Sequence, residues 1–580
     1  MILIFKKFFA LVALFICLAI TGCASLQPAV ETAPEQPAKQ PQAAAKEGEE
    51  KVRPFDRETL YDLLVAEFAG KRNRADVALG KYLKQAHKSQ DPLVAARATR
   101  IARYLGAHQA ALDSAMLWME IEPDNIEAKE IAAIELIRIG EMDNAINLIE
   151  ELLAANAHVN FEFLLQGLKG ADQDRRAHVL NRLTKLIDKH PDNPQLWFTK
   201  GAIEQMEKRW ESALDSFTKA LTIAPHYTNA ILAKSKLLIA LGRDQEALKF
   251  AKKATRDFPK NKRLGISYAR MLISAQMLTE AQGEFGRLAA LYPNDPDLIL
   301  SLALISWENK LIDTAKAQLQ RLIDMRQRVG EAHTYLGRIA AAEKDYETAI
   351  EHFSKIGRGP NYAQARIQLA LVYARSGDFE RAHEVLDVAR AEMPEKDIQF
   401  YLAESEILSK QGQIRPAIEL LNEANEKHPD DTGILYTRAM LLEQVDEYNK
   451  MEADLRAILS QDPNNTAALN ALGYTFADRN ERLDEAVTLI KKAYELDPND
   501  PAIIDSMGWV KYRLGDTETA LSYLRKAYKA FQDQEIAAHL GEVLWVIGQQ
   551  EEAAAIWTEA LKENPDSQIL KRVMERFINQ

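Results

Sequence analysis

The sequence has 580 residues, of which 47% are hydrophobic and 27% are charged, and its formal net charge is −12 at pH 7. An acidic total argues against general nucleic-acid binding, which needs a basic surface. The only cysteines, Cys17 and Cys23, lie near the amino terminus, which excludes disulfides, CxxC redox chemistry and thiolate metal sites from the body of the chain.

The first segment, residues 1–22, has the features of a signal peptide. Two lysines precede an apolar run from Phe8 to Ala19, which is shorter than the ~20 residues needed to span a bilayer. Small residues then precede Cys23, an arrangement that resembles a bacterial lipoprotein signal. The resemblance implies lipidation of Cys23 and, because Ala24 follows, an anchor at the periplasmic face of the outer membrane. The alternative is an ordinary secretory signal with a chance cysteine.

The next segment, residues 23–54, is rich in Ala, Pro, Gln and Glu and has almost no large apolar side chains. Such a composition cannot bury enough surface to fold. We therefore expect a disordered tether between the lipidated Cys23 and the folded part of the chain.

Prolines recur at a fixed spacing after this tether. Pro191, Pro225, Pro259 and Pro293 are each 34 residues apart, and the same rhythm continues to Pro565. A period of 34 residues is typical of helix-turn-helix units that bury their apolar faces by stacking on one another. The sequence therefore predicts an all-α fold, a superhelical solenoid of tandem repeats.

Other positions follow the same period. The unit that starts at Pro194 has Gly201 in its eighth position and Ala213 near its twentieth, where two helices cross closely and larger side chains do not fit. Large apolar residues such as Phe217 fill the space beside them. This pattern resembles the tetratricopeptide repeat.

Fifteen repeats can be counted, with the units at 58 and 160 degenerate. The expected starts are 58, 92, 126, 160, 194, 228, 262, 296, 330, 363, 398, 432, 466, 501 and 534. We expect divergent helical repeats over residues 55–193, regular repeats over 194–565 and a capping helix over 566–580. The repeat at 466 carries one extra residue in its turn, between Asp478 and Leu483.

The sequence carries no catalytic signature. It has no GxxxxGK[ST], GxGxxG, HExxH or GxSxG motif, and its eleven histidines are scattered without metal-ligand spacing. Histidines such as His333 and His539 are therefore interpreted as structural. We predict that the protein is not an enzyme and has no cofactor and no metal site.

A partner is expected to bind where the first helices of the repeats line a groove. In related repeats, positions 2, 5, 9, 12 and 13 face that groove, and near the carboxyl end many of them hold aromatic or charged residues. The alternative is that the aromatics pack between neighbouring helices. The candidate partner-binding residues there are Tyr436, Tyr474, Trp509, Tyr512, Arg513, Glu542 and Trp545.

Charge is uneven near the amino terminus. Residues 51–110 hold twelve Lys or Arg against six Asp or Glu, whereas residues 111–170 hold three against twelve. Arg100 and Arg103 occupy groove-facing positions in the basic block and are further candidates for partner binding. The alternative is that both blocks are solvated helix faces.

The carboxyl-terminal sequence adds a more specific resemblance. From Asn470 onward it contains NALGYTFADRNERLDEA, DSMGWVKYRLG and EIAAHLGEVLWVIGQQEEAAAIW. These stretches resemble a proteobacterial lipoprotein family whose studied member is the outer-membrane binding partner of a periplasmic carboxyl-terminal processing protease. The resemblance implies a membrane-anchored adaptor that binds this protease and presents peptidoglycan hydrolases to it. It carries over no docking residue. We expect the protease to meet the amino-terminal repeats near the tether and the aromatic groove to hold the substrate.

Other functions are also compatible with a repeat lipoprotein. One is an assembly factor for an outer-membrane machine, such as a pilus secretin or the barrel-insertion complex. Another is a component of polysaccharide secretion. Neither alternative involves nucleic acid, and both keep the chain at the membrane through its lipid anchor.

Overall fold

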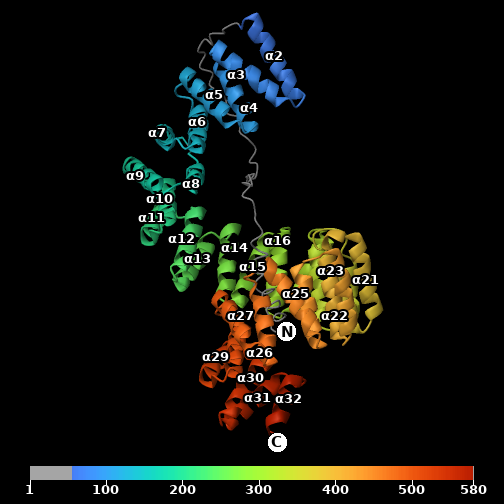
Figure 1. The fold of residues 1–580 in the computed structure, drawn as a ribbon. Coiled ribbons are helices and arrows are strands. Elements are labelled where there is room, and N and C mark those ends of the chain that lie inside the picture. Colours follow the sequence, from blue (N-terminus) through green and yellow to red (C-terminus); the bar gives the residue numbers. More distant parts are fainter. Residues whose placement is uncertain (1–54, 158, 579–580) are drawn as a thin grey trace. The chain divides into compact units, whose positions relative to one another are not determined.

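The structure, a computed structural model, describes residues 55–157 and 159–578. In these residues it contains thirty-one α-helices and one short 3₁₀-helix, and no strand. The helices follow one another as antiparallel pairs along the chain, which Figure 1 shows in the order of its colours. The prediction of an all-α fold of tandem helix pairs is confirmed. The predicted signal, Cys23 and tether lie outside the described residues.

The described chain divides into two compact units, residues 55–327 and residues 328–578. The helices of the first, the amino-terminal unit, are α2 (Arg57–Lys71), α3 (Ala75–Ser89), α4 (Pro92–Tyr104), α5 (His108–Ile121), α6 (Ile126–Ile139), α7 (Met142–Ala154), α8 (Glu162–Leu168), α9 (Gln173–Lys189), α10 (Pro194–Met206), α11 (Trp210–Ile223), α12 (Thr228–Ala240), α13 (Asp244–Asp257), α14 (Lys262–Ser274), α15 (Leu278–Leu291), α16 (Pro296–Glu308) and α17 (Ile312–Asp324).

The second, the carboxyl-terminal unit, continues the pairs and ends in an extra helix. Its elements are α18 (Val329–Ala342), α19 (Tyr346–Ser354), α20 (Tyr362–Ser376), α21 (Phe379–Glu392), η1 (Pro394–Lys396), α22 (Asp397–Lys410), α23 (Ile414–Lys427), α24 (Thr432–Gln444), α25 (Tyr448–Gln461), α26 (Thr466–Asp478), α27 (Leu483–Leu496), α28 (Pro501–Arg513), α29 (Thr517–Ala530), α30 (Gln534–Val546), α31 (Gln550–Glu563) and α32 (Gln568–Ile578). Across both units, no described helix is both long and apolar enough to cross a bilayer.

Local sequence explains where the helices begin and end. The Asn193 side chain accepts hydrogen bonds from the first backbone N–H groups of α10, and Pro194 occupies the first helical position, where no N–H is needed. Helix α11 ends at Ile223, and Pro225 follows, because proline cannot continue a helix. The periodic prolines therefore end the second helix of a pair, as predicted.

Small residues allow the two helices of each pair to approach closely. A Cβ atom on Gly508 would lie 2.6 Å from Leu524 Cγ, and a Cβ atom on Gly541 would lie 2.1 Å from Trp557 Nε1. Alanine at the twentieth position, or at the twenty-first in the repeat with the inserted residue, is fully buried in most repeats. These alanines are Ala213, Ala247, Ala281, Ala315, Ala349, Ala382, Ala417, Ala486, Ala520 and Ala553.

Two departures from the regular repeat stand out. Helix α8 has only 7 residues, in the repeat that the sequence marks as degenerate. The turn between α26 and α27, residues 479–482, is longer than the turn 207–209 between α10 and α11, as the insertion predicts. Asn480 and Arg482 adopt positive φ in this longer turn, and α27 then pairs with α26 in the usual way.

Candidate protein-binding surfaces

Helix α2 turns a polar side toward its neighbour α3. Asp62 is 3% exposed, and it accepts hydrogen bonds from Lys81 Nζ at 2.7 Å, Lys84 Nζ at 3.0 Å and Gln85 Nε2 at 2.8 Å. The buried Thr59 hydroxyl donates to Gln85 Oε1 at 2.8 Å. The bonds from the two lysines and Gln85 lower the pKa of Asp62, so this carboxylate stays ionised. The inner side of α2 is therefore held by ion pairs and hydrogen bonds.

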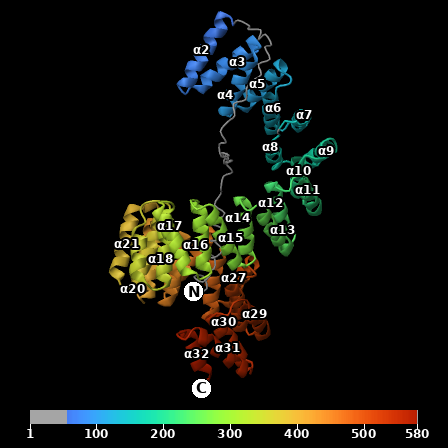
Figure 2. The same cartoon turned by 180° about the vertical axis from the view of Figure 1, so that it is seen from behind.

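The opposite side of α2 is apolar and faces solvent. Leu60, Tyr61, Leu64 and Phe68 are 52%, 66%, 51% and 61% exposed. Because residues four apart lie on one side of a helix, these side chains form a continuous stripe. Figure 2 shows α2 beside α3 at the blue end of the chain. We call these four residues the α2 apolar face.

Cations lie at the two ends of the α2 apolar face, and the exposed Glu67 lies along its side. Arg57 and Lys71 lie at its two ends, and Arg72 follows directly after the helix. All three are exposed. An apolar patch with a polar rim on a soluble surface marks an interaction site. Helix α2 can therefore bind an apolar surface that has acidic residues around it.

Sequence reasoning did not single out the α2 apolar face. The sequence marks the repeat at 58 as degenerate, and in the structure its first helix has Thr59 and Asp62 on the side that packs against α3. The face could have been predicted from the four-residue spacing of Leu60, Leu64 and Phe68, which places them on one side of a helix. Thr59 and Asp62 lie on the opposite side.

The two predicted arginines of the basic block lie on α4. Arg100 forms a bidentate ion pair with Glu127, with Nε–Oε1 at 2.8 Å and Nη2–Oε2 at 2.6 Å. Its guanidinium lies 5.6 Å from the ring centroid of Trp118. Arg103 is exposed one turn later. Because Arg100 already binds a carboxylate within the chain, Arg103 is the freer of the two to meet a partner, and partner binding by both stays a prediction.

Trp509 packs between neighbouring helices. It is 4% exposed, and its ring stacks on His539 with a centroid distance of 4.1 Å and an interplanar angle of 19°. Its Nε1 donates to Asp478 Oδ1 at 3.2 Å. Little of the ring is therefore open to a partner, and partner binding by Trp509 stays a prediction.

Tyr474 belongs to the same polar cluster, which joins α26, α28 and α30. Its hydroxyl donates to Glu535 Oε1 at 2.9 Å and lies 3.3 Å from His539 Nε2, while His539 Nδ1 lies 2.8 Å from Asp505 Oδ2. Burial alone would lower the pKa of His539, but the Asp505 carboxylate raises it to about 9, with Glu535 and Asp478 adding to the effect. His539 is therefore protonated at neutral pH and stabilises the buried carboxylate.

Tyr512 and Glu542 interact with each other across α28 and α30. The Tyr512 hydroxyl donates to Glu542 Oε1 at 3.4 Å, and Glu542 is 6% exposed. Arg513 donates from Nε to the Ala477 carbonyl at 3.0 Å. These groups bind neighbouring helices of the array, and any contact with a partner stays a prediction.

The last two candidates lie apart from this cluster. Trp545 stacks on Trp557 with a centroid distance of 5.7 Å, next to the final helix. Tyr436 on α24 is half-buried, and burial raises its pKa to about 12. The structure thus brings Tyr474, Trp509 and Tyr512 together and leaves Tyr436 and Trp545 on either side.

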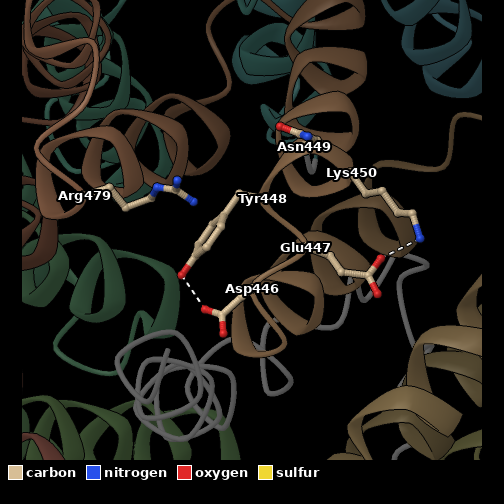
Figure 3. Close-up of a pocket in the computed structure, with 6 residues that line it drawn as sticks. All are labelled: Asp446, Glu447, Tyr448, Asn449, Lys450 and Arg479. Atoms are coloured by element: carbon tan, nitrogen blue, oxygen red, sulfur yellow. Dashed lines mark hydrogen bonds and ion pairs between the residues drawn. The ribbon is translucent and has the colours of Figure 1, made fainter.

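A separate cavity of about 380 Å³ lies at the turn before α25 (Figure 3). The Tyr448 hydroxyl donates to Asp446 Oδ1 at 2.7 Å, and the Arg479 guanidinium lies 3.7 Å from the Tyr448 ring centroid. Lys450 pairs with Glu447 at 2.5 Å. Four of the polar side chains of this cavity therefore already bind one another in pairs. In the described residues, no group of three or more His, Cys, Asp or Glu side chains could hold a metal ion.

Known proteins with this arrangement of helices are repeat proteins. Models of the tetratricopeptide repeat match residues 205–271, 321–391, 436–501 and 506–568. The TPR repeat-containing protein PA4667 of Pseudomonas aeruginosa is 40% identical over 535 residues, which are 92% of this chain and 90% of that protein. The chain belongs to the tetratricopeptide repeat family.

Other similarities are partial or weak. The cellulose synthase 2 operon protein C of Komagataeibacter xylinus is 25% identical over 49% of this chain and 20% of that protein. The solved structure of yeast Tom70 has a TM-score of 0.37 and 14% identity, and the alignment covers 88% of this chain and all of that one. Tetratricopeptide repeats are protein-interaction scaffolds, and the matching models describe no catalytic domain.

Proposed function

We propose that the protein is a membrane-anchored adaptor that binds a periplasmic carboxyl-terminal processing protease and presents substrates such as peptidoglycan hydrolases to it. The resemblance of the sequence from Asn470 onward and the lipoprotein-like signal support this proposal. The structural observation behind this proposal is the α2 apolar face, which supplies a docking surface for a protein beside the predicted tether. The chain itself performs no chemistry in this role.

The α2 apolar face has the composition of an interface centre. Two leucines and two aromatic rings give it several large side chains, and burying such a side chain contributes about 1.5–3 kcal/mol. Aromatic residues often dominate binding energy when a partner excludes water from them. The cations at its rim favour a partner whose apolar patch has acidic neighbours.

An anchored scaffold accelerates proteolysis by raising local concentration. When protease and hydrolase both bind one chain, their encounter becomes intramolecular. A tandem array offers many successive helix faces for such contacts. The adaptor therefore increases cleavage without contributing a catalytic residue.

The test is affinity purification from detergent-solubilised envelope with the full chain as bait. The wild-type bait should recover a periplasmic serine protease together with peptidoglycan hydrolases. Leu64→Asp/Phe68→Asp should lose the protease, with Kd for the purified protease rising by about 100-fold or more.

A matched control separates docking from general surface change. Leu496→Asp/Val546→Asp alters two apolar residues that are 45% and 54% exposed in the carboxyl-terminal unit, and it should bind the protease as the wild type does. Recovery of secretin, barrel-assembly or polysaccharide-export subunits without any protease would replace the adaptor with an assembly role.

A further inference from the structure

A second unusual surface lies in the middle of the amino-terminal unit. From Lys234 to Arg263 the chain holds ten Lys or Arg and three Asp or Glu, a net charge of +7 in a chain whose total is −12. These residues belong to α12, α13 and the start of α14. Such a concentration of one sign produces a local positive potential that the overall acidity conceals.

Four of these cations form a stripe on α13. Lys249, Lys252, Lys253 and Arg256 follow the spacing i, i+3, i+4 and i+7, which places them on one side of the helix. All four are exposed, and in the described part of the chain none forms an ion pair. We call these four residues the α13 cationic stripe.

Cations close to the α13 cationic stripe do form ion pairs. Arg243 pairs with Glu246 at 2.7 Å and with Glu211 at 3.6 Å, and Lys262 pairs with Asp295 at 2.9 Å. The repeat array therefore supplies carboxylates to its neighbours but not to the α13 cationic stripe. Like charges four residues apart on a helix repel one another, so the stripe costs stability in the isolated chain.

The stripe borders a cavity of about 460 Å³ between α12 and α13, which lie side by side in Figures 1 and 2. Phe250 and Lys234 line the same cavity, with Lys234 Nζ 5.0 Å from the Phe250 ring centroid. Burial lowers the pKa of Lys234, and Arg243 adds to this lowering. Glu246, the one carboxylate of the lining, is already bound to Arg243.

We propose that the α13 cationic stripe, with Phe250 and Lys234, binds an acidic segment of a protein partner. Between Lys249 and Arg256 the stripe rises about 10 Å along the helix axis, which suits a few carboxylates on a short peptide or on two turns of a helix. Phe250 adds an apolar contact that a polypeptide side chain can cover. The interaction supplies the negative charge that the stripe lacks.

Two other anionic partners fit less well. A lipid bilayer is flat and would not fill a cavity, and a nucleic acid would extend past the stripe onto acidic neighbours such as Asp244 and Asp257. Tetratricopeptide repeats bind polypeptides, which agrees with a peptide partner. The stripe is a site separate from the α2 apolar face, and it does not depend on the identity of the protease.

The test measures peptide binding to the full chain in non-ionic detergent by fluorescence anisotropy. The probe is a fluorescein-labelled peptide that alternates glutamate and alanine, and its reference is the same peptide with glutamine in place of glutamate. The glutamate peptide should bind, its affinity should fall as salt is raised, and the glutamine peptide should bind at least about tenfold more weakly.

Charge reversal locates the binding. Lys249→Glu/Lys253→Glu should raise Kd for the glutamate peptide by about tenfold or more at low salt. The control Lys529→Glu/Lys571→Glu makes the same change in net charge on exposed helix residues of the carboxyl-terminal unit and should stay within about twofold of wild type. Far-UV circular dichroism and thermal unfolding verify that each variant is folded.

Three results would overturn the proposal. The first is unchanged peptide affinity in Lys249→Glu/Lys253→Glu, and the second is equal affinity for the glutamate and glutamine peptides. The third comes from vesicles containing phosphatidylglycerol or from single-stranded DNA run in parallel. If either binds through the stripe while the peptide does not, the surface belongs to a lipid or a nucleic acid instead.

Discussion

The first and last described helices, α2 and α32, both lie at an end of the repeat array, but they expose opposite kinds of surface. Helix α32 buries Leu570 and Val573 and exposes charged residues such as Lys571 and Glu575. Helix α2 buries Asp62 and exposes its apolar face. A terminal repeat needs a polar outer surface to remain soluble. Among the described helices, α32 therefore has a polar outer surface and α2 has an apolar one.

The largest difference between the two ends should appear when one leucine is shortened at each. Leu570→Ala removes a fully buried side chain and should lower the free energy of unfolding by about 2–5 kcal/mol. Leu64→Ala removes a side chain that is 51% exposed and should change it by about 0.5 kcal/mol or less. Urea unfolding of both variants gives the comparison. Equal losses would mean that the α2 apolar face is packed in solution.

The two ends should also lose stability at opposite extremes of pH. At the carboxyl end, the folded-state pKa of His539 is raised to about 9, so its stabilisation is complete below its unfolded value near 6.5 and is lost as pH rises through 9. The loss should be on the order of 3 kcal/mol. Thermal unfolding between pH 7 and pH 10 measures it. His539→Gln should remove this alkaline loss, whereas the exposed His87→Gln should retain it.

A third comparison is between two glycines, one at the close contact of α30 with α31 and one on the open side of α15. Gly541→Ala would bring a Cβ atom to 2.1 Å from Trp557 Nε1 and should destabilise the fold by about 1–3 kcal/mol. Gly283→Ala on α15 meets nothing within 4 Å and should stabilise the fold by about 0.5–1 kcal/mol through helix propensity. Guanidinium unfolding measures both. A neutral Gly541→Ala would show that α30 and α31 can separate without cost.

The smallest effect should be the acid sensitivity of the α2–α3 pair. The lysines of α3 lower the pKa values of Asp56, Glu58 and Asp62. These carboxylates therefore contribute stability at neutral pH that is lost as pH falls below about 4. Hydrogen exchange should show amide protection in α2 falling with acid or high salt, while amides of α32 serve as the internal reference. Asp62→Asn should weaken α2 in the same way at pH 7.

Much of the fold could be predicted from the sequence because its constraints are local and periodic. Proline ends a helix wherever it falls, so the 34-residue spacing locates the repeats. Gly541 also predicts a close contact between two helices, because only a residue without a side chain fits against Trp557. The extra residue before Leu483 predicts the longer turn between α26 and α27 without knowledge of any distant contact.

The candidate sites were harder to predict because they depend on which side of a helix meets a neighbour. Trp509 occupies a position that can face either a groove or the next helix, and its stacking on His539 cannot be read from the spacing of the repeat. The α2 apolar face was hidden because Asp62 and Thr59 occupy the inner side. The α13 cationic stripe lies in a chain whose total charge is −12, and it becomes visible only when charge is followed along one side of a helix.

The position of α2 at one end of the described helices affects how much of the first repeat stays folded. In a linear array, each helix pair gains most of its stability from the pairs on either side, and α2 has a neighbour on one side only among the described helices. A protein that covers Leu64 and Phe68 would act as the missing neighbour. Binding would then reduce fraying of the array at this end, and partner concentration would set how much of the first repeat stays folded.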